Sequence, residues 1–100
     1  MVLSFTLTTE WSVGANRNLP ANYARFFCAL GLRVREQRTM RKLSQTDMVS
    51  YGFSLRHWQM IEAGGPITMT TLLRVCEAFA ISPEQVLAGL GKHVRRRNRT

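Results

Sequence analysis

The sequence predicts an all-α domain of five helices that follows an N-terminal extended arm or strand. Its 100 residues are enough for one small domain with a single core. After residue 20, one long segment has apolar residues at helical spacing, and four shorter segments each begin at a residue that can cap a helix. We therefore place the arm at 1–19, the helical domain at 20–91 and a basic tail at 92–100.

The arm contains a stretch, from Leu3 to Val13, in which apolar and polar residues alternate. A period of two is typical of a half-buried strand, and a lone strand is not stable in water. No other stretch of the sequence alternates in this way, so we expect the strand to pair with its copy and hold a homodimer. The alternatives are a disordered arm and an arm that packs as a simple extended segment.

The five predicted helices follow a linker, GANRNLP, that is rich in Gly, Asn and Pro. The first helix has apolar residues at helical spacing: Tyr23, Phe27, Leu30 and Val34. The other four begin at capping residues: Ser44, Ser54, Thr68 and Ser82. The last of these starts also has Pro at the first helical position and Gln at the capping-box position.

The fourth helix has a wide apolar stripe that we expect in the core: Met69, Leu72, Leu73, Cys76, Phe79 and Ala80. Val86 and Leu87 can close this core from the fifth helix. The two cysteines, Cys28 and Cys76, lie in periodic apolar stretches without further ligands at metal spacing. We interpret both as reduced core residues rather than as a disulfide or a metal site, and we expect no cofactor.

The charge balance indicates an anionic partner, because 14 basic and 6 acidic residues give a net charge of +8. Nucleic acid is the first candidate and a membrane surface the second. Five basic residues lie in the tail, and the rest of the chain, with 9 basic and 6 acidic residues, has only +3. The tail can therefore bind an anion or simply keep the chain soluble. Short apolar runs and a start without a basic signal region predict a cytoplasmic protein that avoids membranes.

A longer stretch, residues 30–87, reads LGLRVREQRTMRKLSQTDMVSYGFSLRHWQMIEAGGPITMTTLLRVCEAFAISPEQVL. It resembles the Xre-type helix-turn-helix regulators related to phage lambda repressor and Cro. The matching positions are Gly31, Val34, Arg38, Ser44, Gln45, Gly52, Ser54, Ile61, Glu62, Gly64, Pro66, Thr71, Leu72, Leu73, Ala78 and the closing segment 81–87. The resemblance implies a lambda-repressor-like fold that presents the helix over 54–63 to the major groove of DNA.

The resemblance also implies roles for individual residues. The base readers are expected to be Ser54, Leu55, Arg56, Gln59 and Met60. Phosphate contacts are expected from Gln45 and from a clamp of Thr68 with backbone amides near Gly64, and Arg41, Lys42 and His57 can add to them. Arg38 and Glu62 would form a structural ion pair between the first and third helices. A plain solvated helix face is the alternative for Gln45, Arg56 and Gln59.

The sequence departs from the family pattern in the second helix. The separation of Gln45 and Gly52 is one residue shorter than relatives usually have, so the helix or its turn has lost a residue. Met48 or Val49 replaces a small Ala, and Trp58 stands where an aliphatic core residue is usual. The base-reading positions can therefore shift by one residue, whereas the fold is expected to persist.

These observations favour a sequence-specific, double-stranded DNA-binding transcription regulator, expected to be a repressor, that works in the nucleoid as a homodimer. The alternative is a protein-interaction module of the same fold, for example an antitoxin that docks a toxin. Such a partner would meet Leu55 and Met60 or the apolar row of the arm. An enzyme is not expected, because the sequence shows no nucleophile and base pair, no carboxylate cluster and no phosphate loop.

Overall fold

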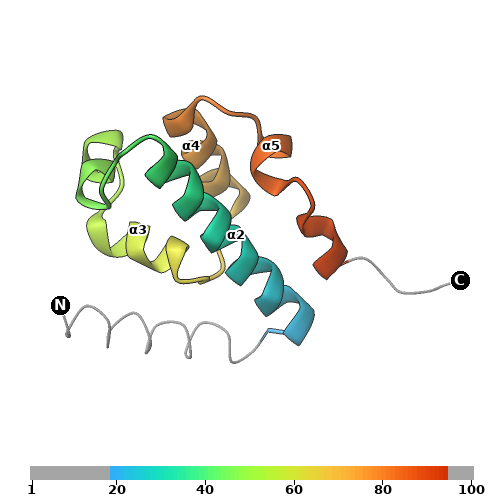
Figure 1. The fold of residues 1–100 in the computed structure, drawn as a ribbon. Helices are drawn as coiled ribbons and strands as arrows, with labels where there is room; N and C mark the ends of the chain where they lie inside the picture. Colours follow the sequence, from blue (N-terminus) through green and yellow to red (C-terminus); the bar gives the residue numbers. More distant parts are fainter. Residues whose placement is uncertain (1–18, 95–100) are drawn as a thin grey trace, which may run out of the picture.

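The computed structural model describes residues 19–94, and all regular structure in this part of the chain is helical (Figure 1). The elements are α2 (Ala21–Met40), the 3-10 helix η1 (Thr46–Tyr51), α3 (Leu55–Glu62), α4 (Met69–Phe79), α5 (Pro83–Leu87) and the 3-10 helix η2 (Leu90–His93). The predicted all-α class is confirmed for these residues. The expected strand from Leu3 to Val13 and the last part of the tail, 95–100, lie outside the described residues.

The long helix α2 runs diagonally through Figure 1 and packs against α3, α4, α5 and η2. Its buried face contains Leu30, Gly31, Val34 and Arg38. Gly31 permits a close crossing with α3, because a Cβ at this position would lie 2.7 Å from the carbonyl oxygen of Glu62. Among the described helices, none is both long and apolar enough to cross a membrane.

The segment predicted as a second α-helix is the 3-10 helix η1, which corrects the expectation for this element. Backbone N–H groups here donate to the carbonyl oxygen three residues earlier, for example from Met48 to Gln45 at 3.1 Å and from Gly52 to Val49 at 3.0 Å. A 3-10 helix rises about 2.0 Å per residue, against about 1.5 Å in an α-helix. The tighter winding therefore lets this segment span more length per residue than an α-helix would.

The predicted starts of the later helices are confirmed by their caps. The side chains of Ser54, Thr68 and Ser82 each accept a hydrogen bond from the backbone N–H three residues further along. Ser82 and Gln85 form the complete capping box expected of them, because the Gln85 side chain also accepts from the Ser82 N–H at 2.8 Å. These bonds use local chemistry, so the three helices begin where the sequence places their caps.

The core lies where α2, α3 and α4 meet, and its largest fully buried side chain is Trp58. The Trp58 ring packs edge-on against the rings of Phe53 and Phe79, with distances between ring centres of 4.9 Å and 5.9 Å. An aliphatic residue was expected at position 58. The Trp58 ring is accommodated there because it packs against other aromatic rings. Together these contacts join the start of α3 to the end of α4.

The face of α4 differs from the predicted stripe. Met69, Leu73 and Ala80 are exposed, whereas Thr71 and Val75 are buried. The buried residues repeat at the three- and four-residue spacing of one helix face, and they are Thr71, Leu72, Val75, Cys76 and Phe79. Apolar residues occupy neighbouring positions along this helix, so the pattern alone allowed a stripe rotated by one residue.

Two further expectations are corrected outside α4. Cys76 is buried as predicted, but Cys28 is exposed on α2, and both are free thiols. The helical domain also continues past residue 91, because η2 includes Lys92 and His93, which were assigned to the tail. Leu90, which is 4% exposed, anchors this last helical turn in the core.

Candidate nucleic-acid interface

The start of α3 forms the exposed part of the candidate interface. Ser54 precedes the helix, and its hydroxyl accepts a 3.0 Å hydrogen bond from the backbone N–H of His57. Ser54, Leu55 and Arg56 are exposed, and Leu55 retains 39% of its surface. Three of the five predicted base readers therefore reach the surface together at the N-terminal end of α3.

The other two predicted readers have contacts within the protein. Gln59 is half-buried, and its Nε2 donates to Oε1 of Gln45 at 3.4 Å. Met60 is partly buried and packs against the core, so only part of its side chain faces solvent. The reason is that α3 is covered on more than one side, by α2 and by η1. The exposed strip of α3 is thus narrower than its amphipathic pattern predicted.

A buried polar network holds the other end of α3, and Glu62 is its centre. Arg38 and Glu62 form the ion pair that was expected, with Nε of Arg38 2.6 Å and Nη2 3.0 Å from the two carboxylate oxygens. Their side chains are only 10% and 5% exposed. Trp58 donates to the same carboxylate at 2.6 Å and Gln45 at 3.0 Å. Each oxygen of Glu62 therefore accepts two hydrogen bonds, which compensates its burial.

Gln45 belongs to this network rather than to the open surface. It lies just before η1 and is half-buried, and its amide nitrogen donates to Glu62 while its amide oxygen accepts from Gln59. A phosphate contact by the Gln45 side chain would have to use its second amide hydrogen or replace one of these bonds. The sequence identified the residue, but these internal partners were not predicted.

Two residues at the end of α2, Arg41 and Lys42, were expected to contact phosphate. Arg41 is hydrogen-bonded within the protein, and Lys42 is exposed. The guanidinium of Arg41 donates to the carbonyl oxygen of Phe79 at 2.9 Å and to the backbone and side-chain oxygens of Gln37, each at 2.8 Å. It also lies 4.8 Å from the centre of the Phe79 ring. Arg41 thus ties α2 to the end of α4, whereas Lys42 remains exposed in a left-handed backbone conformation.

The second expected phosphate clamp is largely closed. The backbone N–H of Gly64 donates to the carbonyl oxygen of Ile61 at 3.2 Å, and that of Gly65 donates to the carbonyl oxygen of Met60 at 3.1 Å. Both glycines are buried, so these amides complete the end of α3 and are not open to an anion. The Thr68 hydroxyl caps α4 by accepting from Thr71 and lies at an exposed position. Of the expected clamp, only Thr68 remains at the surface.

One residue of the interface was not singled out by the sequence. Arg74, on α4, donates from Nη2 to the carbonyl oxygen of Gly52 at 2.6 Å, and its guanidinium lies 4.4 Å from the centre of the Phe53 ring. It therefore connects α4 to the turn that precedes α3. The only local signal was a basic residue within an apolar stripe, which also fits a solvated helix side.

The exposed start of α3 presents the hydroxyl of Ser54, the aliphatic side chain of Leu55 and the guanidinium of Arg56. This combination can contact a ligand that has both polar and apolar groups. Glu62 is the only acidic residue of α3 and is paired, so the charge of Arg56 is not opposed from its own helix. Within the described residues, no group of three or more potential metal ligands occurs. Comparison with protein-family models, curated proteins and solved structures found no match to this chain.

Proposed function

We propose that the chain is a sequence-specific DNA-binding regulator with a lambda-repressor-like helix-turn-helix arrangement. The observation that carries the proposal is the asymmetry of α3. Its N-terminal end exposes Ser54, Leu55 and Arg56, while its C-terminal end is held by the Glu62 network. A recognition helix needs this combination, because base edges are read by side chains near its N-terminus from a fixed helix axis.

The elements around α3 support the same arrangement. The 3-10 helix η1 contacts α3, and the turn between them is made at Gly52, whose φ of 96° is in the left-handed region that favours glycine. Two short helices joined by a tight turn with glycine form the outline of a helix-turn-helix. The shortened first helix of this pair does not remove the outline, because 3-10 winding compensates for its length.

Base reading is assigned to the exposed residues. Arg56 can donate two hydrogen bonds to O6 and N7 of guanine, and Leu55 can contact a thymine methyl group. Ser54 can bond to either kind of base edge, although its hydroxyl already accepts the bond that caps α3. Gln59 would read adenine with its amide oxygen and its second amide hydrogen, or by releasing Gln45. Met60 is left out of the reading set because it packs against the core.

Contacts to the phosphate backbone of DNA would come from exposed polar side chains around α3. Lys42 and Thr68 are exposed, and His57 is half-exposed on α3. With the net charge of +8, such contacts predict an affinity that falls steeply as salt concentration rises. We expect the protein to act as a homodimer on a palindromic or pseudo-palindromic site, and to repress when that site overlaps a promoter.

The test is selection of bound fragments from random double-stranded DNA by the full chain at moderate salt. A shared motif with two half-sites about 10 base pairs apart, or a multiple of this spacing, is expected. Arg56→Ala should relax the preference at one base pair of each half-site, whereas Lys42→Ala should weaken all sequences alike. Recovery of fragments without a shared motif would contradict the proposal, and uniform weakening by Arg56→Ala would remove Arg56 from the readers.

A second candidate is a protein-docking module, such as an antitoxin. It is favoured by apolar side chains on neighbouring elements, because Val49 and Tyr51 of η1 and Leu55 of α3 are 49%, 46% and 39% exposed. Exposed large apolar side chains on adjacent elements are typical of protein contact sites. Val49→Asp should abolish binding of a toxin encoded beside this chain and leave the selected DNA motif unchanged. This candidate would be contradicted if the unmodified chain bound no such toxin and Val49→Asp abolished recognition of the DNA motif.

A further inference from the structure

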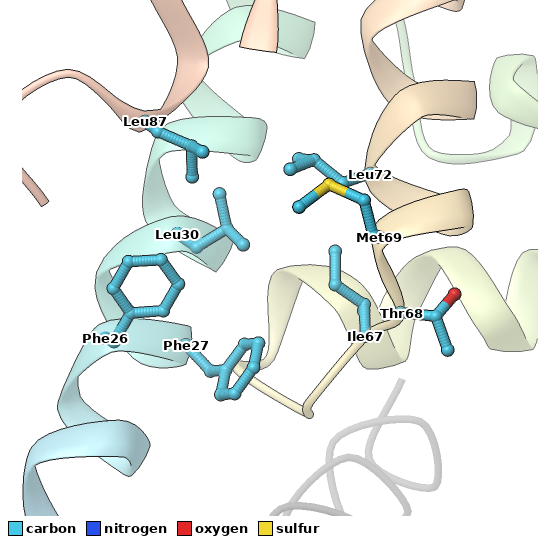
Figure 2. Close-up of a pocket in the computed structure, with 8 residues that line it drawn as sticks. All are labelled: Phe26, Phe27, Leu30, Ile67, Thr68, Met69, Leu72 and Leu87. Atoms are coloured by element: carbon cyan, nitrogen blue, oxygen red, sulfur yellow. The ribbon is translucent and has the colours of Figure 1, made fainter. Parts of the chain in front are cut away.

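An apolar groove lies between the first half of α2 and the start of α4 (Figure 2). Phe26, Phe27 and Leu30 form one wall, and Ile67, Met69 and Leu72 form the other. Figure 2 shows Leu30, Ile67, Met69 and Leu72 directed toward a common space, with Leu87 of α5 beside it. The groove is on the surface of the domain, and Met69 on its rim is 63% exposed.

The lining selects an apolar occupant of limited size. Thr68 is the only polar residue in the lining, and its hydroxyl is already used in the cap of α4. The hollow has a volume of about 160 Å³. An apolar cavity of about 150 Å³ accommodates a benzene ring. The groove therefore fits one large aromatic or aliphatic side chain, and it offers no charge to hold a polar ligand.

We propose that the groove holds Trp11 of the same chain. The described part of the chain begins at residue 19, next to α2, and the sequence before it contains an apolar row that needs a partner surface: Leu3, Phe5, Leu7 and Trp11. Trp11 is the member of this row nearest in sequence to α2. The proposal is independent of DNA binding and uses the row inside one subunit rather than for pairing between subunits.

The tether is long enough for this contact. Residues 12–20 separate Trp11 from the start of α2 at Ala21. An extended stretch of nine residues reaches about 30 Å. Phe26, on the groove wall, lies five residues into α2, which is about 8 Å along the helix axis. The length of the tether therefore exceeds what is needed to bring Trp11 to the groove.

The short tether also favours the chain's own segment over that of a second copy. A covalent tether of about this length holds its end at an effective concentration of about millimolar near the groove. The corresponding segment of another copy has to bind from solution at its actual concentration. At micromolar protein, the intramolecular contact is therefore formed first, and the groove of each copy is filled by its own Trp11.

The experiment measures Trp11 fluorescence in the full chain. Trp58 is fully buried and provides a constant background, so subtracting the spectrum of the Trp11→Phe variant isolates the emission of Trp11. We expect emission at shorter wavelength than that of a tryptophan in water, and acrylamide quenching that is several-fold weaker. Met69→Glu, which places a charge on the groove rim, should shift the Trp11 emission to longer wavelength and restore full quenching.

The matched control is Leu73→Glu, one turn further along α4, which is 46% exposed and does not line the groove. It should leave the Trp11 emission unchanged, and circular dichroism should show both glutamate variants folded because both sites are exposed. Water-like emission of Trp11 in the unmodified chain would overturn the proposal, and so would insensitivity to Met69→Glu. A shift that disappears on dilution would instead assign the groove to the segment of a second copy and would also overturn it.

Discussion

The indole Nε1 of Trp58 donates a 2.6 Å hydrogen bond to Oε2 of Glu62, one turn further along α3. The same oxygen accepts from Nε of Arg38, while the other accepts from Arg38 and Gln45. Three elements of the domain, α2, α3 and the start of η1, thus meet at one carboxylate. An aliphatic residue in place of Trp58 could not supply the fourth donor, so the indole both fills the core and completes the network.

Glu62→Gln should strongly destabilise the fold. The substitution leaves the Arg38 guanidinium buried without its counter-charge, and the new amide turns N–H groups toward other donors. Removing one partner of a buried ion pair costs about 3–5 kcal/mol. We expect a loss of this size in the free energy of unfolding measured with urea. Glu77→Gln, at an exposed site on α4, is the control and should change it by less than about 0.5 kcal/mol.

Gly31→Ala should also destabilise the domain, because its Cβ would lie 2.7 Å from the carbonyl oxygen of Glu62 and 2.8 Å from that of Ile61. Backbone atoms cannot move aside as a flexible side chain can, so α2 and α3 would have to separate. Overpacking of this kind costs about 1–3 kcal/mol. Gly91→Ala meets no atom within 4 Å and should be neutral or slightly stabilising. Equal thermal midpoints for the two variants would contradict the close crossing.

Features that depend on neighbouring residues could be predicted from the sequence. The caps at Ser54, Thr68 and Ser82 are of this kind, because each side chain bonds to a backbone N–H three residues away. The Arg38–Glu62 pair, 24 residues apart, followed from a resemblance and not from local chemistry. The all-α class followed from the number of such starts and from the helical spacing of apolar residues.

Other features depend on contacts that the sequence does not specify. Arg41 and Phe79 are 38 residues apart. Nothing in the local sequence RTMRK indicates that Arg41 bonds to the end of a distant helix rather than to a phosphate. The 3-10 winding of η1 depends on how this segment packs against α3. The rotation of α4 was ambiguous because adjacent positions are both apolar. Packing decided each of these, and it also holds part of the Met60 side chain against the core.

The Asp47 carboxyl should titrate below the ordinary range of an aspartate. The backbone N–H of Ser44 donates to it at 2.7 Å, and this bond is the main cause that lowers the pKa, followed by the Ser44 hydroxyl. A depressed pKa means that the contribution of Asp47 to stability is present at neutral pH and is lost as pH falls through the folded-state pKa. Nuclear magnetic resonance of the carboxyl carbon across acidic pH measures this titration.

Ser44→Ala separates the two causes of the Asp47 shift. The variant removes the hydroxyl and keeps the backbone donor, so the pKa of Asp47 should rise only part of the way to its ordinary value. Asp47→Asn should remove the corresponding step from the pH dependence of stability. A full return of the pKa in Ser44→Ala would show that the hydroxyl, and not the backbone N–H, is the main cause.

Arg74→Met should loosen the turn before α3 while leaving the domain folded. The substitution keeps an apolar stem but removes the bond to the Gly52 carbonyl and the charge over the Phe53 ring. For a partly exposed group, the loss in unfolding free energy should be about 1 kcal/mol. Hydrogen exchange should accelerate at the Gly52 and Phe53 amides, which bond within this turn. Arg35→Met, at an exposed position of α2, is the control, and equal exchange in both variants would contradict a holding role for Arg74.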